Sequence, residues 1–291
     1  MTKRVAPKPS LRERLEDKNK IIVLPGVFDA LSARIAEQVG FEAMFQTGYG
    51  SSAALLGMPD FGLMNAGETV DNARRIIRAV KVPVLVDADT GYGNPLNVWR
   101  LVQDLENQGA AGIFLEDQIW PKRCGHMIGK DVIPTGEYLP KLKAAIEARK
   151  SKDFIIVART DARAPIGLDE AIARGHAYRK AGADVVFVEA PRSIEELKKV
   201  ANEIDAPLVA NMIEDGVTPN LPAHELLKLG YRIAVFPLSA LYSATYAVRE
   251  VLTELKKTGA TRQTRKMMVT FKDFNRFVDL DTYLGLEKRY S

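Results

Sequence analysis

The architecture of this chain is most evident in residues 154–190, which read FIIVARTDARAPIGLDEAIARGHAYRKAGADVVFVEA. This stretch contains an apolar run (154–161), a polar loop, a segment of helical period (168–181) and a second apolar run (184–190). Each run stays apolar almost to its C-terminal end, which is typical of strands buried on both faces of a parallel sheet. The helical segment begins with acidic residues and ends before Gly182, so the stretch predicts a strand, a helix and a parallel strand.

The same alternation recurs along most of the chain. Eight apolar runs can be identified, at residues 21–26, 43–48, 82–90, 112–117, 154–161, 184–190, 207–212 and 232–237. Amphipathic segments of helical spacing lie between them, for example at 70–80 and 245–259. Eight strand–helix units predict an α/β fold of the (β/α)8 TIM-barrel type. A doubly wound sheet is the alternative, but no G-x-G-x-x-G follows any of the runs.

We expect a single domain over residues 1–291, with the barrel core at about 21–259 and a C-terminal helical extension at 260–291. Flanking helices are expected at both ends of the barrel. Residues 267–284 are rich in apolar and aromatic side chains, which is too apolar for a segment that hangs free. This segment is therefore expected to pack on the barrel or on another subunit.

The composition excludes several classes of protein. With 46% hydrophobic and 27% charged residues, it is that of a soluble globular chain. One cysteine, Cys124, excludes an intrachain disulfide, and three histidines are too few for a structural zinc cluster. Neither a membrane helix nor a signal peptide is visible, so we expect a cytoplasmic protein without membrane contact. A net charge of +4 is too small to require a nucleic-acid partner.

Polar residues collect at the C-terminal ends of the predicted strands, where barrels of this type carry their active sites. Asp87 and Asp89 alternate along one strand and should point to the same side, with Glu116 on the next strand beside them. Such carboxylates repel each other unless a cation lies between them or one is protonated. Oxygen ligands without clustered histidines favour Mg²⁺ or Mn²⁺ over Zn²⁺. The alternative is that Asp87 and Asp89 only cap the following loop.

Cys124 has cationic neighbours in sequence, namely Lys122, Arg123 and His126. Such neighbours lower the pKa of a thiol and favour the thiolate. A thiol at this place could act as a general acid or base at a carbon centre. The alternative is an ordinary loop cysteine.

Arg159 ends a buried strand and needs a partner, because an unpaired buried guanidinium is costly. The partner is either a substrate carboxylate or Glu189 on the next strand. Asn211 and Ser239 can donate hydrogen bonds to further substrate oxygens or, alternatively, cap their loops. Thr47-Gly48 opens a turn whose backbone N–H groups suit a carboxylate.

This set of residues suits the cleavage of a carbon–carbon bond beside a carboxylate, which leaves an enolate. A divalent cation stabilises the enolate charge as it forms. A protonated thiol then delivers a proton to the enolate carbon.

Several motifs in the same order resemble the isocitrate lyase / phosphoenolpyruvate mutase superfamily from about residue 25 to residue 259. They are Lys122-Arg123-Cys124-Gly125-His126, Asp87-Ala88-Asp89-Thr90-Gly91-Tyr92-Gly93, Leu115-Glu116-Asp117-Gln118 and Ala158-Arg159-Thr160-Asp161-Ala162. The resemblance implies a barrel whose eighth helix is exchanged between subunits, in a homotetramer built from helix-swapped dimers. It also implies an essential Mg²⁺ near Asp87, Asp89 and Glu116, and an acid/base role for Cys124. Further site positions implied are Thr47, Gly48, Tyr49, Asp60, Lys122, Gly125, His126, Arg159, Glu189 and Asn211.

Two positions depart from the lyase pattern. Phe114 stands where many lyase relatives have histidine, and Tyr242 stands where methylisocitrate lyases have an arginine for a third carboxylate. Together with the string 211–216, this resembles the subgroup of petal death protein, 2,3-dimethylmalate lyase and carboxyphosphonoenolpyruvate phosphonomutase. Arg265 in the C-terminal tail could retain one cationic contact to substrate.

The expected function is a Mg²⁺-dependent carbon–carbon lyase that acts on a small 2-hydroxy or 2-oxo dicarboxylate, of the substituted malate or oxaloacetate type. Catalytic residues are expected to be Cys124, Lys122 and His126. Alternatives within the superfamily are a 2-methylisocitrate lyase and a carboxyphosphonoenolpyruvate phosphonomutase. An alternative of another class is a non-catalytic binding protein, but its basic residues (Lys256, Lys257, Arg262, Arg265 and Lys266) are dispersed without an aromatic stacking platform.

Overall fold

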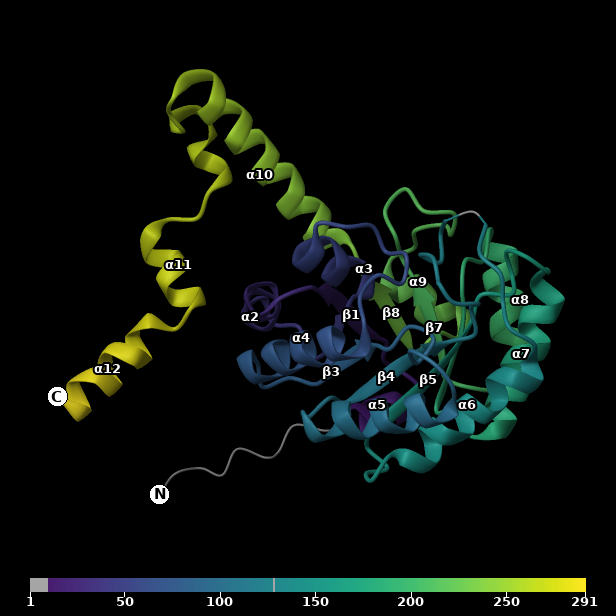
Figure 1. Cartoon of the computed structure of the whole chain (residues 1–291). Coiled ribbons are helices and arrows are strands. Elements are labelled where there is room, and N and C mark those ends of the chain that lie inside the picture. Colours follow the sequence, from purple (N-terminus) through teal and green to yellow (C-terminus); the bar gives the residue numbers. More distant parts are fainter. Residues whose placement is uncertain (1–9, 128) are drawn as a thin grey trace.

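Eight parallel strands close into a barrel in the computed structural model, which describes residues 10–127 and 129–291 (Figure 1). The strands are β1 (Ile22–Val27), β2 (Met44–Gln46), β3 (Val84–Asp87), β4 (Gly112–Glu116), β5 (Ile155–Thr160), β6 (Val185–Val188), β7 (Leu208–Asn211) and β8 (Ile233–Phe236). Each strand pairs with the next along the chain, and β8 pairs with β1. The predicted (β/α)8 barrel is confirmed, and each predicted run coincides with one strand to within a few residues.

Helices surround the barrel and extend it at both ends. They are α1 (Leu11–Glu16), α2 (Ala30–Val39), α3 (Gly48–Ser51), the π-helical turn η1 (Ser52–Leu56), α4 (Ala66–Ala79), α5 (Pro95–Asn107), α6 (Thr135–Ala148), α7 (Leu168–Ala181), α8 (Ile194–Glu203), α9 (Ala223–Leu229), α10 (Ser239–Thr258), the 3₁₀ turn η2 (Arg262–Met267), α11 (Phe271–Phe277) and α12 (Leu280–Tyr290). None of the helices in the described ranges has the length and apolar character that crossing a membrane would require.

Local capping signals set the helix ends. The predicted helix at 168–181 is observed with the same bounds and ends in a left-handed Gly182. The helix predicted to begin at residue 70 begins at Ala66 instead, because Asn65 and Glu68 form a capping box there. The helix predicted at 245–259 starts at Ser239, directly after β8, since its first turns carry no apolar repeat that would mark the start.

A layer of phenylalanine side chains fills the barrel interior below the C-terminal ends of the strands. The ring of Phe114 lies 4.6 Å from that of Phe45 and 6.0 Å from that of Phe187. These rings belong to one buried cluster with inward-facing residues of other strands, and Leu11 and Leu15 of α1 join that cluster. The polar ends of the strands therefore stand on an apolar floor.

Gly26 of β1 lies against the backbone of Pro237, the residue that follows β8. A Cβ atom at this position would overlap the backbone of Pro237. Because both partners are backbone, no side chain can move aside to make room. Closure of the barrel at this seam depends on the missing side chain.

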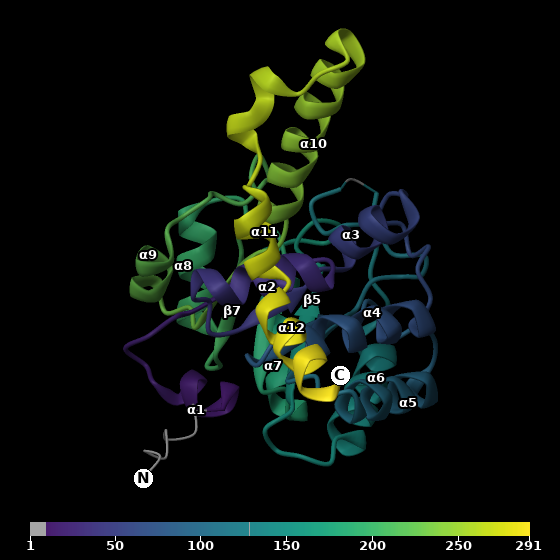
Figure 2. The ribbon, with the colours of Figure 1, turned by 90° about the vertical axis from the view of Figure 1, so that its left-hand side faces the viewer.

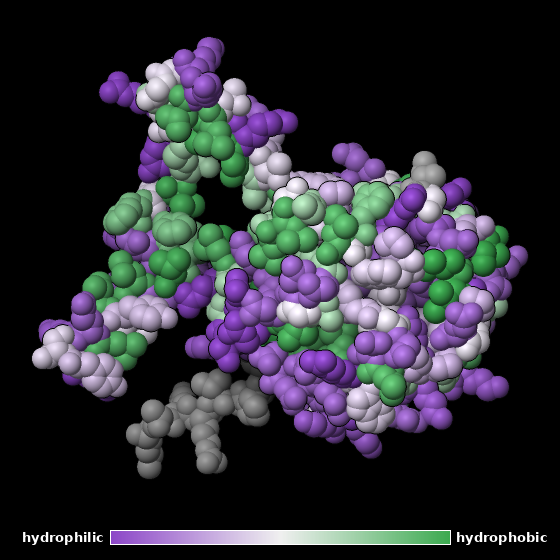
Figure 3. Space-filling model, viewed as in Figure 1, coloured by the Kyte–Doolittle hydropathy of each residue, from purple (hydrophilic) through white to green (hydrophobic). Residues whose placement is uncertain are grey.

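The helix α10 does not pack along the barrel. It projects outward, and α11 returns beside α2, with α12 following toward the C-terminus (Figures 1 and 2). Arg34 and Gln38 of α2 donate to the carbonyl of Phe277, at 3.2 and 3.3 Å, where α11 ends. No residue of α10, α11 or α12 is buried, and apolar side chains gather along this arm (Figure 3).

An apolar groove of about 780 Å³ lies on the barrel next to the first turns of α10. Its walls come from β1, α2 and β8, and they include Val23, Val27, Leu31, Ile35 and Phe236. In a barrel of this type, the helix after β8 would cover such a surface. Here α10 covers only the rim of the groove, through Ala240 and Ala244.

Candidate active site

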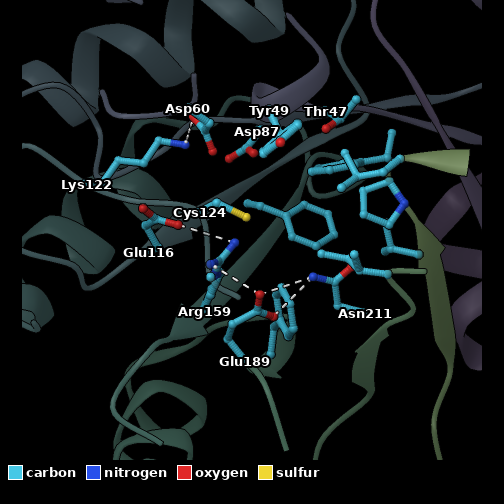
Figure 4. Close-up of a pocket in the computed structure, with 18 of the residues that line it drawn as sticks. Thr47, Tyr49, Asp60, Asp87, Glu116, Lys122, Cys124, Arg159, Glu189 and Asn211 are labelled. Carbon is cyan, nitrogen blue, oxygen red and sulfur yellow. Dashed lines mark hydrogen bonds and ion pairs between the residues drawn. The ribbon is translucent and has the colours of Figure 1, made fainter. Parts of the chain in front are cut away.

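A pocket opens at the C-terminal ends of the strands, above the phenylalanine layer (Figure 4). Most of the residues predicted from the strand-end motifs line it: Thr47, Tyr49, Asp60, Asp87, Glu116, Lys122, Cys124, Gly125, Arg159, Glu189 and Asn211. They lie at the ends of six strands, β2 to β7, or in the loops that follow them. The barrel topology thus brings together side chains that are far apart in the sequence.

The carboxylates of Asp87 and Asp89 meet near the backbone of Gly48. Gly48 N donates to Asp87 Oδ2 at 3.1 Å, and Asp89 N donates to Asp87 Oδ1 at 3.2 Å. β3 ends at Asp87, and Asp89 lies in a turn with φ +46°, so the two residues do not alternate along one strand as predicted. The predicted proximity of the two carboxylates holds, since both lie beside Gly48. Burial and the adjacent Asp89 raise the pKa of Asp87 to about 6.

Lys122 lies between two carboxylates. Its Nζ is 2.5 Å from Asp60 Oδ1 and 2.7 Å from Asp89 Oδ1, and all three side chains are buried. Burial alone favours the neutral amine, but Asp89 and Asp60 together raise the pKa of Lys122 well above its usual value. Lys122 is therefore a fixed positive charge at this side of the pocket.

Glu116 stands at the end of β4 and is incompletely satisfied. Its Oε2 lies 3.4 Å from Arg159 Nη1, whereas its buried Oε1 has no hydrogen-bond partner. Burial raises the pKa of Glu116 well above its usual value. A buried carboxylate oxygen without a donor is destabilising unless a cation or a proton compensates for it.

We call the carboxylates of Asp87, Asp89 and Glu116 the acidic corner of the site. These oxygen donors fit a hydrated Mg²⁺. Within residues 10–127 and 129–291, no group of three or more His, Cys, Asp or Glu side chains is arranged to hold an ion by itself. Mg²⁺, however, keeps several waters and needs only one or two carboxylates. The raised pKa of Asp87 and the unpartnered Oε1 of Glu116 are two features that a nearby cation would relieve.

The thiol of Cys124 points into the pocket between the acidic corner and Arg159 (Figure 4). Burial raises the pKa of this thiol to about 11. The sequence-based expectation of a thiolate is therefore wrong, because desolvation of the anion outweighs the effect of the cationic neighbours. The geometry supplies a protonated thiol, which is a proton donor.

Arg159 is held by Asp161 rather than by Glu189. Its Nε lies 2.8 Å from Asp161 Oδ2 and its Nη2 lies 3.0 Å from Asp161 Oδ1, whereas Glu189 Oε1 is 3.5 Å away. The guanidinium also lies over the ring of Phe187, 5.2 Å from its centre. The bidentate contact fixes the orientation of Arg159 and leaves Nη1 on the side of Glu116.

His126 and Asn211 both face Glu189. Asn211 Nδ2 donates to Glu189 Oε1 at 3.1 Å, and His126 Nε2 lies 3.5 Å from the same oxygen. His126 Nδ1 accepts from the backbone N of Val217 at 3.1 Å. Burial lowers the pKa of His126, so the imidazole is neutral near pH 7.

Two predicted substrate contacts are not in the pocket of this chain. Ser239 is the first residue of α10, and its hydroxyl donates to the carboxylate of Glu214. Arg265 lies in η2 at the outer end of α10 (Figure 1), where it donates to the Met268 carbonyl at 3.0 Å. Neither displacement is visible in the sequence, because both follow from the direction in which α10 leaves the barrel.

The sequence analysis missed Asp161, Phe187 and Lys130. Asp161 has a signal, since it follows Arg159 by two residues, directly after the end of β5 at Thr160. Phe187 reads like any core residue of β6, and Lys130 reads like a solvated loop lysine. The contacts of these two residues arise only when distant segments pack together.

The comparisons with known proteins agree with this geometry. The family model "Phosphoenolpyruvate phosphomutase" matches residues 11–256. The carboxyvinyl-carboxyphosphonate phosphorylmutase of Arabidopsis thaliana is 50% identical over 96% of this chain and 83% of its own. The 2,3-dimethylmalate lyase of Eubacterium barkeri is 45% identical over 97% of both chains.

Solved structures are similar over nearly the whole chain. Oxaloacetate acetylhydrolase in complex with 3,3-difluorooxalacetate has a TM-score of 0.91 at 36% identity, covering 97% of this chain and 96% of its own. Phosphonopyruvate hydrolase in complex with oxalate and Mg²⁺ has a TM-score of 0.86 at 28% identity, covering 96% and 97%. The resemblance found in the sequence motifs is thereby confirmed. The chain belongs to the phosphoenolpyruvate phosphomutase family, within the isocitrate lyase / phosphoenolpyruvate mutase superfamily.

Proposed function

We propose that the protein is a Mg²⁺-dependent carbon–carbon lyase that cleaves a small 2-hydroxy or 2-oxo dicarboxylate of the substituted malate or oxaloacetate type. The observation that carries the proposal is the protonated thiol of Cys124, which points into a pocket that also holds Arg159 and a cluster of carboxylates. Two of the similar proteins, 2,3-dimethylmalate lyase and oxaloacetate acetylhydrolase, are named for substrates of this class.

Each residue has a distinct part in the cleavage. Arg159 binds a substrate carboxylate, while Asp161 holds the guanidinium in place. The C2–C3 bond breaks, its electron pair stays on C3, and C2 becomes the carbonyl carbon as the hydroxyl proton leaves to a base. Cys124 donates its proton to C3 and is then a thiolate until it is reprotonated. A 2-oxo substrate enters the same step as its hydrate.

The acidic corner would hold the metal ion, through Asp87, Asp89 and Glu116. Bound Mg²⁺, or Mn²⁺ in its place, would supply positive charge that stabilises the negative charge developing on substrate oxygen. Lys122 with Asp60 keeps this corner from accumulating uncompensated negative charge. In the turn Thr47-Gly48-Tyr49, the N–H groups of Thr47 and Gly48 already donate to Val27 and Asp87, so the N–H of Tyr49 would be the donor to a second substrate carboxylate. Gly125, Glu189 and Asn211 line the opposite side, and His126 lies against Glu189.

The far wall of the pocket favours a dicarboxylate over a tricarboxylate. Tyr242 hydrogen-bonds to the pocket residue Tyr49, and burial together with this contact raises the pKa of Tyr242 to about 12. The wall near Tyr242 therefore presents a neutral hydroxyl rather than a cation. Glu214 lies near Tyr242, and one of its buried carboxylate oxygens has no hydrogen-bond partner. This carboxylate would repel a third carboxylate of a substrate.

A substrate panel with Mg²⁺ tests the assignment. Dimethylmalate, oxaloacetate, 2-methylisocitrate and a carboxyphosphonoenolpyruvate are compared by the identity and amount of the products. We expect a dicarboxylate to give the highest kcat/KM, with both fragments formed in equal amounts, and chelation by EDTA to abolish turnover. Faster cleavage of 2-methylisocitrate than of every dicarboxylate, or rearrangement of the phosphonate alone, would contradict the proposal.

Cys124→Ser tests the role of the thiol. The hydroxyl of serine is a far weaker acid, so we expect kcat to fall by about 10²–10⁴-fold while the circular dichroism spectrum stays the same. Full activity in the serine variant would exclude Cys124 as the acid. A non-catalytic binding protein would show no turnover with either chain.

We also propose that the chain forms a homotetramer of helix-swapped dimers, as one domain with a helical C-terminal extension. The exposed apolar side chains of α10–α12 and the apolar groove beside β1 and α2 support this assembly. In the exchanged arrangement, α10 of one chain would cover the groove of the next. A reducing, cytoplasmic setting suits the single cysteine thiol.

A further inference from the structure

Lys130 is a buried lysine outside the pocket, and its ammonium group contacts two residues next to Arg159 and Cys124. Its side chain is 2% exposed, and its Nζ lies 2.8 Å from Asp161 Oδ1. The same Nζ donates to the carbonyl oxygen of Gly125, the residue after Cys124. Lys130 is not among the residues that line the pocket. Burying an ammonium is costly unless it is paired and hydrogen-bonded, and these two contacts supply a carboxylate partner and a carbonyl acceptor.

Asp161 connects Lys130 to the substrate-binding guanidinium. It accepts both hydrogen bonds of Arg159, and its backbone N donates to Asp117 Oδ1 at 2.9 Å. Asp117 is in turn held by Arg174 and Tyr178 of α7, at 2.9 and 2.7 Å. Asp161 is therefore anchored to the helical layer of the barrel. Arg159 and Lys130 are therefore both anchored on the same fixed carboxylate.

Gly125 is the second point that Lys130 fixes. A Cβ atom at this position would overlap both Glu189 and Arg159, so the backbone here lies directly against the site. The carbonyl oxygen of Gly125 accepts the hydrogen bond from Lys130 Nζ. A shift of this carbonyl would move Cys124, because the two residues are adjacent in the chain.

We propose that Lys130 is a positioning residue, whose ammonium holds the turn bearing Cys124 and the carboxylate that orients Arg159 in one fixed arrangement. The proposal rests on the proposed function of the site. Reacting groups displaced by about 1 Å can lose roughly 100-fold in rate. We therefore expect Lys130→Ala to lower kcat by about 100-fold. Arg159 keeps both bonds to Asp161, so KM should rise by less than about tenfold.

The single thiol gives a test that does not depend on turnover. Cys124 is the only cysteine of the chain, so its alkylation by iodoacetamide without substrate reports its surroundings alone. In Lys130→Ala the freed turn should expose the thiol and speed alkylation by at least about tenfold. Added n-propylammonium, which replaces the deleted atoms, should slow alkylation again and restore part of kcat.

Arg149→Ala is the matched control. Arg149 also donates to one carboxylate, Asp184, and to one backbone carbonyl, that of Phe154 at 3.0 Å. It lies before β5, at the opposite end of the barrel from the pocket. Its loss should lower the unfolding temperature while alkylation stays within about twofold of wild type and kcat is unchanged.

An alkylation rate in folded Lys130→Ala within twofold of wild type would overturn the proposal. Wild-type chain that turns over no substrate of the panel would instead contradict the proposed function, while the alkylation comparison would still decide the role of Lys130. If Lys130→Ala is not recovered folded, Lys130→Gln keeps a donor without the charge. That variant should then alkylate at least about threefold faster, and an unchanged rate would again reject the proposal.

Discussion

The chemistry proposed for this pocket depends on the protonation of one thiol. The sequence places Cys124 among cationic residues, which by themselves favour a thiolate. In the structure the cations are already engaged: Lys122 binds Asp60 and Asp89, and Arg159 binds Asp161. What remains is burial, which raises the pKa of Cys124 to about 11. A thiol of this kind suits proton donation better than nucleophilic attack.

The pH dependence of Cys124 alkylation follows from this pKa. Only the thiolate reacts, so the rate should rise by about tenfold per pH unit from pH 7 and show no plateau below about pH 10. Stopped assays with iodoacetamide on the folded, substrate-free protein measure it. A plateau between pH 8 and 9 would mean that the thiol has an ordinary pKa and that burial does not govern it.

The bidentate contact of Arg159 gives a second prediction. Lysine cannot make both bonds to Asp161 and also face the substrate, so Arg159→Lys should lower kcat/KM by about 100-fold, mostly through KM. Arg163→Lys is the control, because Arg163 makes the same kind of two-bond contact to Glu196 outside the pocket. Equal kcat/KM values for the two variants would argue against carboxylate binding by Arg159.

Most of the pocket could be predicted from the sequence, because its residues follow strands. Asp87, Glu116, Arg159 and Glu189 each end an apolar run, and parallel strands bring such ends to one face. The exact partners could not be predicted. Arg159 lies 2.8 Å from Asp161 and 3.5 Å from Glu189, and this difference depends on side-chain orientations that the sequence does not show. The ion pair between Lys130 and Asp161 joins segments separated by 31 positions, which no local pattern encodes.

The secondary-structure elements followed their local signals where these were strong. The helix at 168–181 has an acidic start and a glycine end, and its bounds were predicted correctly. The start of α10 was placed six residues too late, because its first turns at Ser239 are small and partly exposed rather than amphipathic. Element ends without a capping signal are set by tertiary contacts, which the sequence does not show.

The seam between β1 and β8 allows a test of barrel closure. Gly26→Ala would force a methyl group into the backbone of Pro237, so we expect a loss on the order of 3 kcal/mol in the free energy of unfolding. Gly136→Ala is the matched change, since a Cβ there meets nothing and the residue lies in α6. That variant should be neutral or up to about 1 kcal/mol more stable. Urea unfolding of both proteins, followed by circular dichroism, gives the comparison.

The described part of the chain exposes many large apolar side chains along α10–α12. On α10 alone, Val248 and Leu252 are each 56% exposed, while the groove beside β1 and α2 is only partly covered. A second copy of the chain, with its own arm, is the occupant that suits both surfaces.

Charge on that arm should disrupt the assembly. Leu252→Glu is expected to shift the protein from a tetramer to smaller species, since a buried carboxylate without a partner opposes association. Sedimentation velocity at several protein concentrations measures the shift. Lys257→Glu, on the same helix but outside the apolar set, should leave the assembly intact. A wild-type protein that sediments as a monomer at every concentration would refute the exchanged-helix assembly.

The phenylalanine layer has a stereochemical consequence. Phe45, Phe114 and Phe187 line the pocket together with Cys124, so the thiol would reach a bound substrate carbon from one side only. If turnover runs in D₂O, a product whose new C–H carbon carries two different substituents should incorporate one deuterium and be formed as a single enantiomer. Chiral analysis of the labelled acid would thus show which face of the planar enolate is protonated by Cys124.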